Sequence, residues 1–241
     1  MPYIYIKFVT TVMCIFLGCS SSNDAAHKDQ QDLKGLYPSE TLIIDTHTEW
    51  TRGHYPIRIK EFMAHPLEHG DIVFLGNSIT EQGGDWGARF HNPKVKNRGI
   101  AGDTTDGVLA RLNELIYYTP SKVFMLIGIN DAFRDDMTAQ AIYDNIIKIV
   151  HRIHNESPDT QIFLQTVLPT TTEHLKMKIQ KINALLMGTE LTEPYNLIGL
   201  HDYFATENDL MDMAFSTDGV HLNENGYRNW VNVITNLVDK E

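Results

Sequence analysis

The sequence has few cysteines and fewer basic than acidic residues. Its two cysteines, Cys14 and Cys19, both lie near the N-terminus of the 241-residue chain. The rest of the chain therefore excludes a disulfide framework and a catalytic thiol. Lys and Arg number 20 against 31 Asp and Glu, for a formal net charge of −11. This acidic balance argues against nucleic-acid binding, which needs a basic surface, and against adhesion to an anionic membrane face.

The N-terminus resembles a targeting segment. Lys7 precedes a mostly apolar run over residues 8–18, shorter than the roughly 20 residues that a membrane-spanning helix needs. This pattern predicts a removable signal segment at residues 1–18. Phe16-Leu17-Gly18-Cys19 resembles the lipobox of bacterial lipoproteins, which implies lipidation of Cys19 and anchoring in the bacterial cell envelope, at the outer membrane. The alternative is a plain secretory signal cut elsewhere. Residues 19–40 are polar and predict a flexible tether.

The remaining residues, 41–241, have the composition of one globular domain, which begins with a short N-terminal extension at residues 41–67. In the extension, residues 41–50 alternate loosely like an outlying strand, and residues 55–65 have partial helical spacing. Beyond it, apolar runs of strand length alternate with amphipathic segments of helix length. The alternation predicts a parallel sheet between helices, with right-handed crossovers. We expect strands at 71–76, 95–100, 122–128, 161–168 and 196–201, and helices near 84–90, 104–116, 138–155, 173–189 and 223–238.

A serine follows the first of these strands directly. Residues 72–75 are apolar, and Gly76-Asn77 ends the run with residues that tolerate tight turns. Ser78 is therefore expected just past the carboxyl end of a parallel strand, where open α/β sheets bind their ligands. The alternative is that Ser78 only caps the helix that follows.

A histidine and a carboxylate stand close together near the other end of the chain. Asp218 precedes His221 by three residues, with Gly219 between them. Across a tight turn the carboxylate can accept a hydrogen bond from Nδ1–H of the ring, which leaves Nε2 free to act as a base. The alternative is a turn-forming Asp beside a surface His.

Asn130 ends the central strand, in Gly128-Ile129-Asn130-Asp131. Its amide offers a donor to a developing oxyanion, although Asn is also a common turn residue. The glycines of residues 99–102 could indicate a phosphate loop, but they lack the G-x-G-x-x-G spacing. A metal site is no better supported, because His151 and His154 have no third ligand near them in sequence.

The chain resembles the SGNH (GDSL-type) hydrolases in four sequence blocks, over roughly residues 68–238. The resemblance is greatest to the branch that holds the platelet-activating-factor acetylhydrolase catalytic subunits and bacterial carbohydrate O-acetylesterases, especially through residues 97–105 and 108–112. It implies a three-layer α/β/α, flavodoxin-like fold with a five-stranded parallel sheet. One departure is Asn77, where the family usually has Asp. The blocks are Gly76-Asn77-Ser78, Gly99 to Gly102, Gly128-Ile129-Asn130-Asp131 and Asp218-Gly219-Val220-His221.

The resemblance also implies the residue roles. Ser78 would be the nucleophile, His221 the general base and then acid, and Asp218 its orienting partner. The oxyanion hole would use the backbone N–H groups of Ser78 and Gly102 and the side-chain amide of Asn130. No cofactor and no metal are implied.

These inferences predict an envelope-anchored serine esterase that removes a short acyl group, chiefly acetyl, from a carbohydrate or another small ester substrate. The segments expected at the rim of the site are mostly polar, which suits sugar hydroxyls better than a long acyl chain. We expect substrate contacts from Asp103, Phe133 and Trp86, with either aromatic ring as a stacking face. Two alternatives stay open: a lysophospholipase or related lipid acyl hydrolase, and an inactive glycan-binding lipoprotein.

Overall fold

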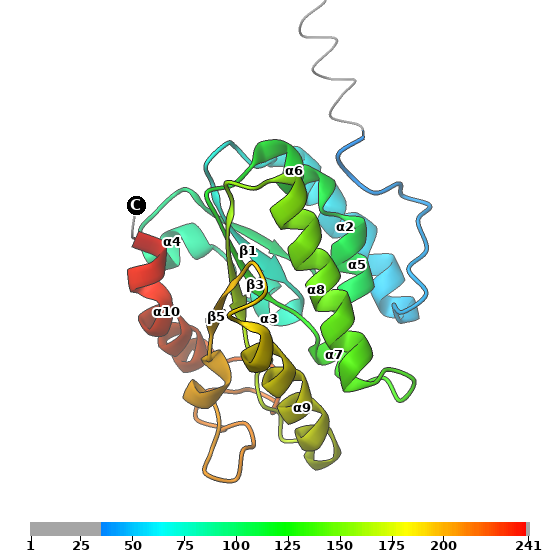
Figure 1. Cartoon of the computed structure of the whole chain (residues 1–241). Coiled ribbons are helices and arrows are strands. Elements are labelled where there is room, and N and C mark those ends of the chain that lie inside the picture. The colour runs from blue at the N-terminus through cyan, green and yellow to red at the C-terminus, as the bar shows by residue number, and fades with distance from the viewer. Residues whose placement is uncertain (1–34, 240–241) are drawn as a thin grey trace, which may run out of the picture. The chain divides into compact units, whose positions relative to one another are not determined.

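Five parallel strands form the centre of the structure, a computed structural model that describes residues 35–239 (Figure 1). They lie in the order β2-β1-β3-β4-β5, so the predicted five-stranded parallel sheet is confirmed. Several strands end earlier than predicted, because the residues after them form turns and short helices. The strands are β1 (Ile72–Gly76), β2 (Val95–Gly99), β3 (Lys122–Leu126), β4 (Gln161–Gln165) and β5 (Asn196–Ile198).

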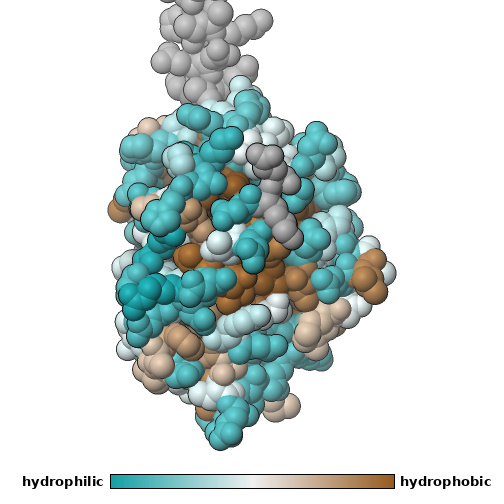
Figure 2. All heavy atoms as spheres, turned by 90° about the vertical axis from the view of Figure 1, so that its left-hand side faces the viewer, coloured by the Kyte–Doolittle hydropathy of each residue, from teal (hydrophilic) through white to brown (hydrophobic). Residues whose placement is uncertain are grey.

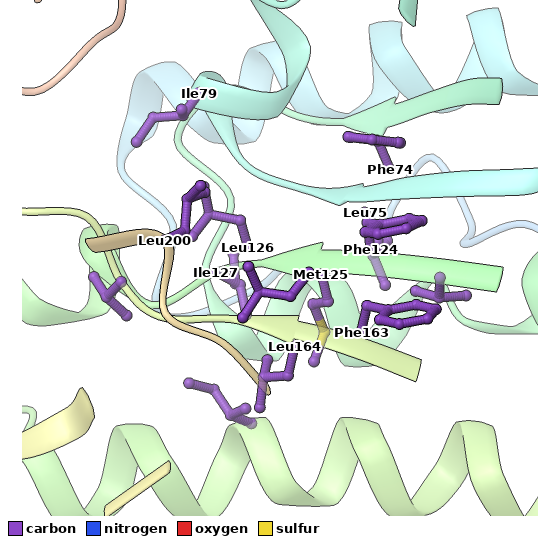
Figure 3. Close-up of a cluster of buried hydrophobic side chains, with 14 of the residues drawn as sticks. Phe74, Leu75, Ile79, Phe124, Met125, Leu126, Ile127, Phe163, Leu164 and Leu200 are labelled. Atoms are coloured by element: carbon purple, nitrogen blue, oxygen red, sulfur yellow. The ribbon is translucent and has the colours of Figure 1, made fainter. Parts of the chain in front are cut away.

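The central strands are apolar because helices cover both faces of the sheet. Phe74, Phe124 and Phe163 occupy paired positions on β1, β3 and β4. Their rings stack across the strands, with centroids 5.1 Å apart between Phe74 and Phe124 and 4.7 Å apart between Phe124 and Phe163. Figure 3 shows these rings among the buried aliphatic side chains of the same strands. This packing fixes the register of β1, β3 and β4.

Two helical layers enclose the sheet and confirm the predicted three-layer fold (Figure 1). One layer holds α5 (Thr105–Ala110), α6 (Asn113–Tyr118), α8 (Ala139–Glu156) and α9 (Glu173–Thr189); the other holds α4 (Trp86–Phe90) and α10 (Glu224–Asp239). On α10, Tyr227, Trp230, Ile234 and Val238 are buried at helical spacing. Figure 2 shows the outer side of this second layer, where hydrophilic residues cover most of the surface around a smaller hydrophobic area.

The helix predicted at residues 104–116 is divided between α5 and α6. Arg111 leaves the helical conformation at the break, with φ −115° and ψ 20°. Its buried guanidinium donates to Asp103 Oδ2 at 2.9 Å and to the carbonyl of Gly76 at 3.0 Å. Periodicity alone predicts one helix here, because the break depends on these long-range contacts.

The N-terminal extension forms turns and then a helix instead of the predicted outlying strand at residues 41–50, and the helical spacing predicted at residues 55–65 is confirmed. Turns lead into α2 (Glu49–Ala64), whose N-cap is Thr48. The Thr48 hydroxyl accepts the N–H of Thr51 at 3.1 Å, an ordinary helix-start signal that the loose alternation obscured. The inner face of α2 forms a small core of its own with the residue after β2; its members are Tyr55, Ile59, Phe62 and Ile100.

The last residues of the predicted tether lie against the domain. Leu36 is buried, and Tyr37 donates its hydroxyl to Glu114 Oε1 at 2.9 Å. The predicted signal segment, Cys19 and most of the tether lie outside the described residues. Within residues 35–239, no helix combines the length and the hydrophobicity needed to cross a membrane.

Candidate active site

Ser78 is the first residue of a short helix, α3 (Ser78–Glu81), that begins directly after β1. Asn77 is the N-cap of this helix, and its Oδ1 accepts the N–H of Ile79 at 3.1 Å. The capping role considered for Ser78 therefore belongs to its neighbour. The tight turn from β1 into α3 needs glycine at residue 76, because a Cβ there would lie 2.4 Å from the carbonyl oxygen of Leu126.

The serine hydroxyl meets the histidine predicted from the far end of the chain. His221 Nε2 lies 2.9 Å from Ser78 Oγ, and Nδ1 of the same ring lies 2.7 Å from Asp218 Oδ2. A carboxylate on Nδ1 favours the tautomer that carries its proton there. Nε2 is then left as an acceptor for the serine proton, which is the geometry of a nucleophile, a base and an orienting acid.

A closed turn holds Asp218 and His221 together. The other oxygen of the carboxylate, Oδ1, accepts the backbone N–H groups of Val220 at 2.9 Å and of His221 at 2.8 Å. Gly219 has φ +89°, and a Cβ on it would lie 2.0 Å from Thr171 Oγ1. Only glycine fits this turn without strain.

The same hydrogen bonds keep Asp218 ionised. Burial raises the pKa of this carboxyl, but the hydrogen bonds from the His221 ring and from the backbone N–H groups of His221 and Val220 lower it to about 2. The carboxylate therefore carries its charge at every pH at which the histidine could act as a base.

Three possible oxyanion donors surround the serine. The N–H groups of Ser78 and Gly102 have no hydrogen-bond partner among residues 35–239. Asn130 follows β3, in the short helix α7 (Ile129–Ala132), and its Nδ2 donates to the carbonyl of Asp103 at 2.8 Å. That bond uses one amide hydrogen and leaves the second available, since a side-chain amide has two.

The candidate nucleophile, base and oxyanion donors open into one pocket of about 530 Å³. It lies beyond the carboxyl ends of β1, β2 and β3, around the point where the strand order reverses. Open α/β sheets bind their ligands at this point. The pocket is lined by Thr46, His47, Thr48, Trp50, Thr51, Ser78, Gln82, Ala101, Gly102, Thr104, Asn130, Phe133, Arg134 and His221.

Of the three predicted substrate contacts, the structure places one in the pocket. Phe133 lines it and is 43% exposed. Trp86 is a wrong prediction, because it is buried in the core, where its ring stacks on Phe74 at 4.3 Å and its Nε1 donates to the carbonyl of Thr80. The residues around Trp86 in the sequence are polar and gave no sign that its ring packs against the sheet.

Asp103 is also a wrong prediction as a substrate contact. It is fully buried, and its carboxylate lies 3.0 Å from His47 Nε2 and 2.9 Å from Arg111 Nε. Both carboxylate oxygens of Asp103 thus have partners within the protein, and these contacts stabilise the loop that follows β2. Such a buried charge is stable only because it is paired on both sides.

The contribution of residues 46–51, around the start of α2, was not evident from the sequence. Trp50 is 63% exposed at the pocket, and His47 lines it from a buried position. The available signal was the helix start at Thr48, with the acidic Glu49 in the first turn. Because residues 41–50 were predicted to form an outlying strand, they were not expected at the site.

Asp131 carries a buried carboxyl group for which the sequence suggested no role. Burial raises its pKa to about 6, although hydrogen bonds from the hydroxyl and the backbone N–H of Thr105 lower it. These bonds join α7 to the start of α5. Among the residues that the structure describes, no group of three or more His, Cys, Asp or Glu side chains is placed to hold a metal ion.

A family model described as the GDSL-like lipase/acylhydrolase family matches residues 74–228. None of the curated proteins matches the chain. Solved structures with the same fold include a GDSL-like lipase from Bacteroides thetaiotaomicron, at 22% identity and a TM-score of 0.68, over 77% of this chain and 97% of that one.

Two further structures have the fold at similar identity. A protein described as a platelet activating factor from Streptococcus pneumonia is 21% identical, with a TM-score of 0.62, over 90% of this chain and 100% of that one. An acetylxylan esterase from Geobacillus stearothermophilus is 19% identical, with a TM-score of 0.59, over 73% of this chain and 96% of that one.

Proposed function

Because the chain belongs to the GDSL-like lipase/acylhydrolase family, it is an ester hydrolase, and we propose that it removes short acyl groups, chiefly acetyl, from carbohydrate. The family agrees with the SGNH resemblance of the four sequence blocks. The observation that carries the proposed chemistry is the continuous path of hydrogen bonds from Asp218 through His221 to Ser78.

The reaction proceeds in two steps through an acyl-enzyme. Ser78 Oγ attacks the ester carbonyl while His221 Nε2 takes its proton, and Asp218 stabilises the imidazolium that forms. The oxyanion accepts hydrogen bonds from the N–H groups of Ser78 and Gly102 and from the amide of Asn130. His221 then donates its proton to the leaving alcohol oxygen, and the same ring activates the water that releases the acid.

The lining of the pocket supports a sugar substrate. Its polar side chains are mainly hydroxyls and amides, four of them threonines. Thr51 and Thr104 are buried, while Thr46 and Thr48 reach the surface and can exchange hydrogen bonds with sugar hydroxyls. Trp50 and Phe133 add exposed aromatic faces. An acetylxylan esterase of the same fold acts on an acetylated glycan, which agrees with this substrate class.

Labelling with a fluorophosphonate tests the nucleophile. We expect the protein to be labelled covalently and the Ser78→Ala variant to lose both labelling and turnover of p-nitrophenyl acetate, since the acyl-enzyme needs that oxygen. Ser121→Ala is the matched control, because Ser121 lies just before β3 and bonds the carbonyl of Gly70. Labelling that persists without Ser78 would contradict the assignment.

Acetate release from a set of acetylated glycans tests the substrate class. Release by the protein, abolished in Ser78→Ala, would support a carbohydrate esterase. Binding of these glycans with no release of acetate and no turnover of p-nitrophenyl acetate would instead support a silent glycan-binding protein.

We further propose that Cys19 carries the lipid that anchors the enzyme in the bacterial cell envelope, at the outer membrane. The support is the lipobox-like sequence of residues 16–19. Cys19→Ser should give an active enzyme that is lost from the membrane fraction, since lipid chains contribute about 0.8 kcal/mol per buried CH₂. Retention of the Cys19→Ser protein in that fraction would point to another anchor.

A further inference from the structure

A segment that precedes the family domain forms one wall of the pocket. The family match begins at residue 74, yet five of the residues 46–51, all except Glu49, line the pocket together with Ser78 and His221. We infer that Trp50 in this segment is the face on which the sugar ring of the substrate stacks, and that it determines preference for sugar esters over simple esters. This inference rests on the proposed function and names the group that recognises the leaving alcohol.

Trp50 has the exposure and the place that such a role requires. Its side chain is 63% exposed although it is the largest apolar side chain in the lining. Isolated apolar residues are common on protein surfaces, but this one borders the candidate nucleophile's pocket, where Phe133 offers a second exposed ring. A flat indole suits the apolar C–H face of a sugar ring, and the neighbouring hydroxyls suit its polar edge.

The segment is fixed to the loops that hold the oxyanion donors. Thr46 Oγ1 lies 2.7 Å from Thr104 Oγ1, and the carbonyl of Thr46 accepts Arg134 Nη1 at 3.1 Å. Thr51 lies so close to Gly102 that a Cβ on that glycine would be 2.2 Å from the Thr51 hydroxyl. The wall is therefore held in place before substrate arrives, which lowers the cost of ordering it on binding.

The ring of Trp50 is also supported from behind. It stacks on His54 at a centroid distance of 4.8 Å and an interplanar angle of 23°. His54 Nε2 lies 3.0 Å from both carboxylate oxygens of Glu81. Glu81 in turn accepts the N–H of Ala101 at 2.5 Å, next to Gly102. These contacts link the stacking face to the oxyanion loop through side chains that each have a partner.

Kinetics of Trp50 variants on two esters test this role. Xylose tetraacetate offers a sugar ring with an ester at every position, and ethyl acetate offers the same acyl group without a ring. For Trp50→Ala we expect KM on xylose tetraacetate to rise roughly 3- to 10-fold, the range of a lost stacking contact, while kinetics on ethyl acetate stay within about twofold. Trp50→Phe should restore most of the loss.

The control variant is Ile57→Ala, which removes an exposed apolar side chain on α2 that does not line the pocket. It should change neither substrate's kinetics. Calorimetry can measure the binding of xylose tetraacetate without turnover if Ser78→Ala is compared with the double variant Ser78→Ala/Trp50→Ala. The double variant should bind more weakly, by the same factor as the rise in KM.

An unchanged KM and unchanged binding for Trp50→Ala would overturn the stacking role, while acetate release by the wild-type enzyme would leave the proposed function standing. Equal losses on both esters would also overturn it and assign Trp50 a structural role. Turnover of ethyl acetate with no acetate release from acetylated sugars would reject the carbohydrate proposal, and this inference with it.

Discussion

The side-chain amide of Asn130 has two hydrogens. One is donated to the carbonyl of Asp103 at 2.8 Å, and we propose the other as a donor to the oxyanion. Because the oxyanion develops only as the ester is attacked, such a donor would act mainly on the transition state. Asn130→Ala should lower kcat by about 10²–10³, or roughly 2.7–4 kcal/mol, with little change in KM.

Steady-state kinetics on p-nitrophenyl acetate measure this change, and thermal unfolding shows whether the variant stays folded. An effect on KM alone would instead make Asn130 a substrate-binding residue.

Asp131 gives the stability of the protein a pH dependence. Its pKa is raised to about 6 in the folded protein, mainly by burial, so the folded state binds a proton that the unfolded state has already released. The contribution of Asp131 to the free energy of unfolding is greatest below the pKa that this carboxyl has in the unfolded chain, near 4. The contribution is lost as the pH rises to 6. The free energy of unfolding should therefore fall by up to about 3 kcal/mol across this window, relative to Asp131→Asn.

Urea unfolding of both proteins at several pH values from 4 to 7 measures this difference. Asp131→Asn keeps an acceptor for Thr105 and removes the titration, so the difference between the two curves isolates the carboxyl. A difference that does not change between pH 4 and 6 would show that Asp131 has an ordinary pKa.

Asn77 shows what a single residue type can and cannot predict. Its departure from the family's usual Asp put the electrostatic role of that position in question. In the structure Asn77 Oδ1 accepts the N–H of Ile79, a cap that either residue can form. Its Nδ2 is buried without a hydrogen-bond partner in the part of the chain that the structure describes. The sequence predicted a tight turn at Asn77 but not this cap, and the unpaired donor depends on the surrounding core.

At the scale of elements, the break between α5 and α6 has a stability consequence. Arg111 ends α5 and pairs with Asp103 in a site where both side chains are buried. Removing one partner leaves the other charge buried, which costs more than the pair itself contributes. Arg111→Ala should lower the free energy of unfolding by about 3–5 kcal/mol.

Denaturant unfolding measures this loss, and Arg228→Ala on the exposed side of α10 is the control, expected to stay within about 0.5 kcal/mol. A loss for Arg111→Ala no larger than that of the control would mean that the Asp103 charge finds another partner.

The accuracy of the sequence predictions depended on the range of the contacts. Asp218 and His221 are three residues apart, so a local turn determines their bond and the sequence could predict it. Trp86 and Asp103 were placed wrongly because their burial depends on packing against distant elements. Their own neighbours in sequence are polar and suggested a rim.

At the scale of the whole molecule, the parallel sheet determines where the site forms. The order β2-β1-β3-β4-β5 places the ends of β2 and β3 on either side of Ser78. The alternation of strands and helices predicted this gathering, because the carboxyl ends of parallel strands share one edge. The sequence could not show that α2 folds over that edge, since its contacts with the loop after β2 span more than forty residues.

We expect the pocket that results to favour short acyl groups. A long-chain site needs a continuous apolar trough, in which each CH₂ contributes about 0.8 kcal/mol. Octanoyl would then be favoured over acetyl by several kcal/mol. Here threonines, Gln82, Asn130 and Arg134 interrupt the apolar faces of Trp50 and Phe133, so a longer chain gains little and meets polar groups that prefer water.

On p-nitrophenyl esters, which keep the leaving group constant, kcat/KM should therefore be highest for acetyl or propionyl and decline beyond butyryl. Trp50→Ala serves as a control for the acyl side, because a ring that holds the alcohol part should change all members of the series by a similar factor. A maximum at octanoyl would mean that the apolar rings line an acyl-chain site. The carbohydrate proposal would then give way to a lipid acyl hydrolase with the same nucleophile, base and oxyanion donors.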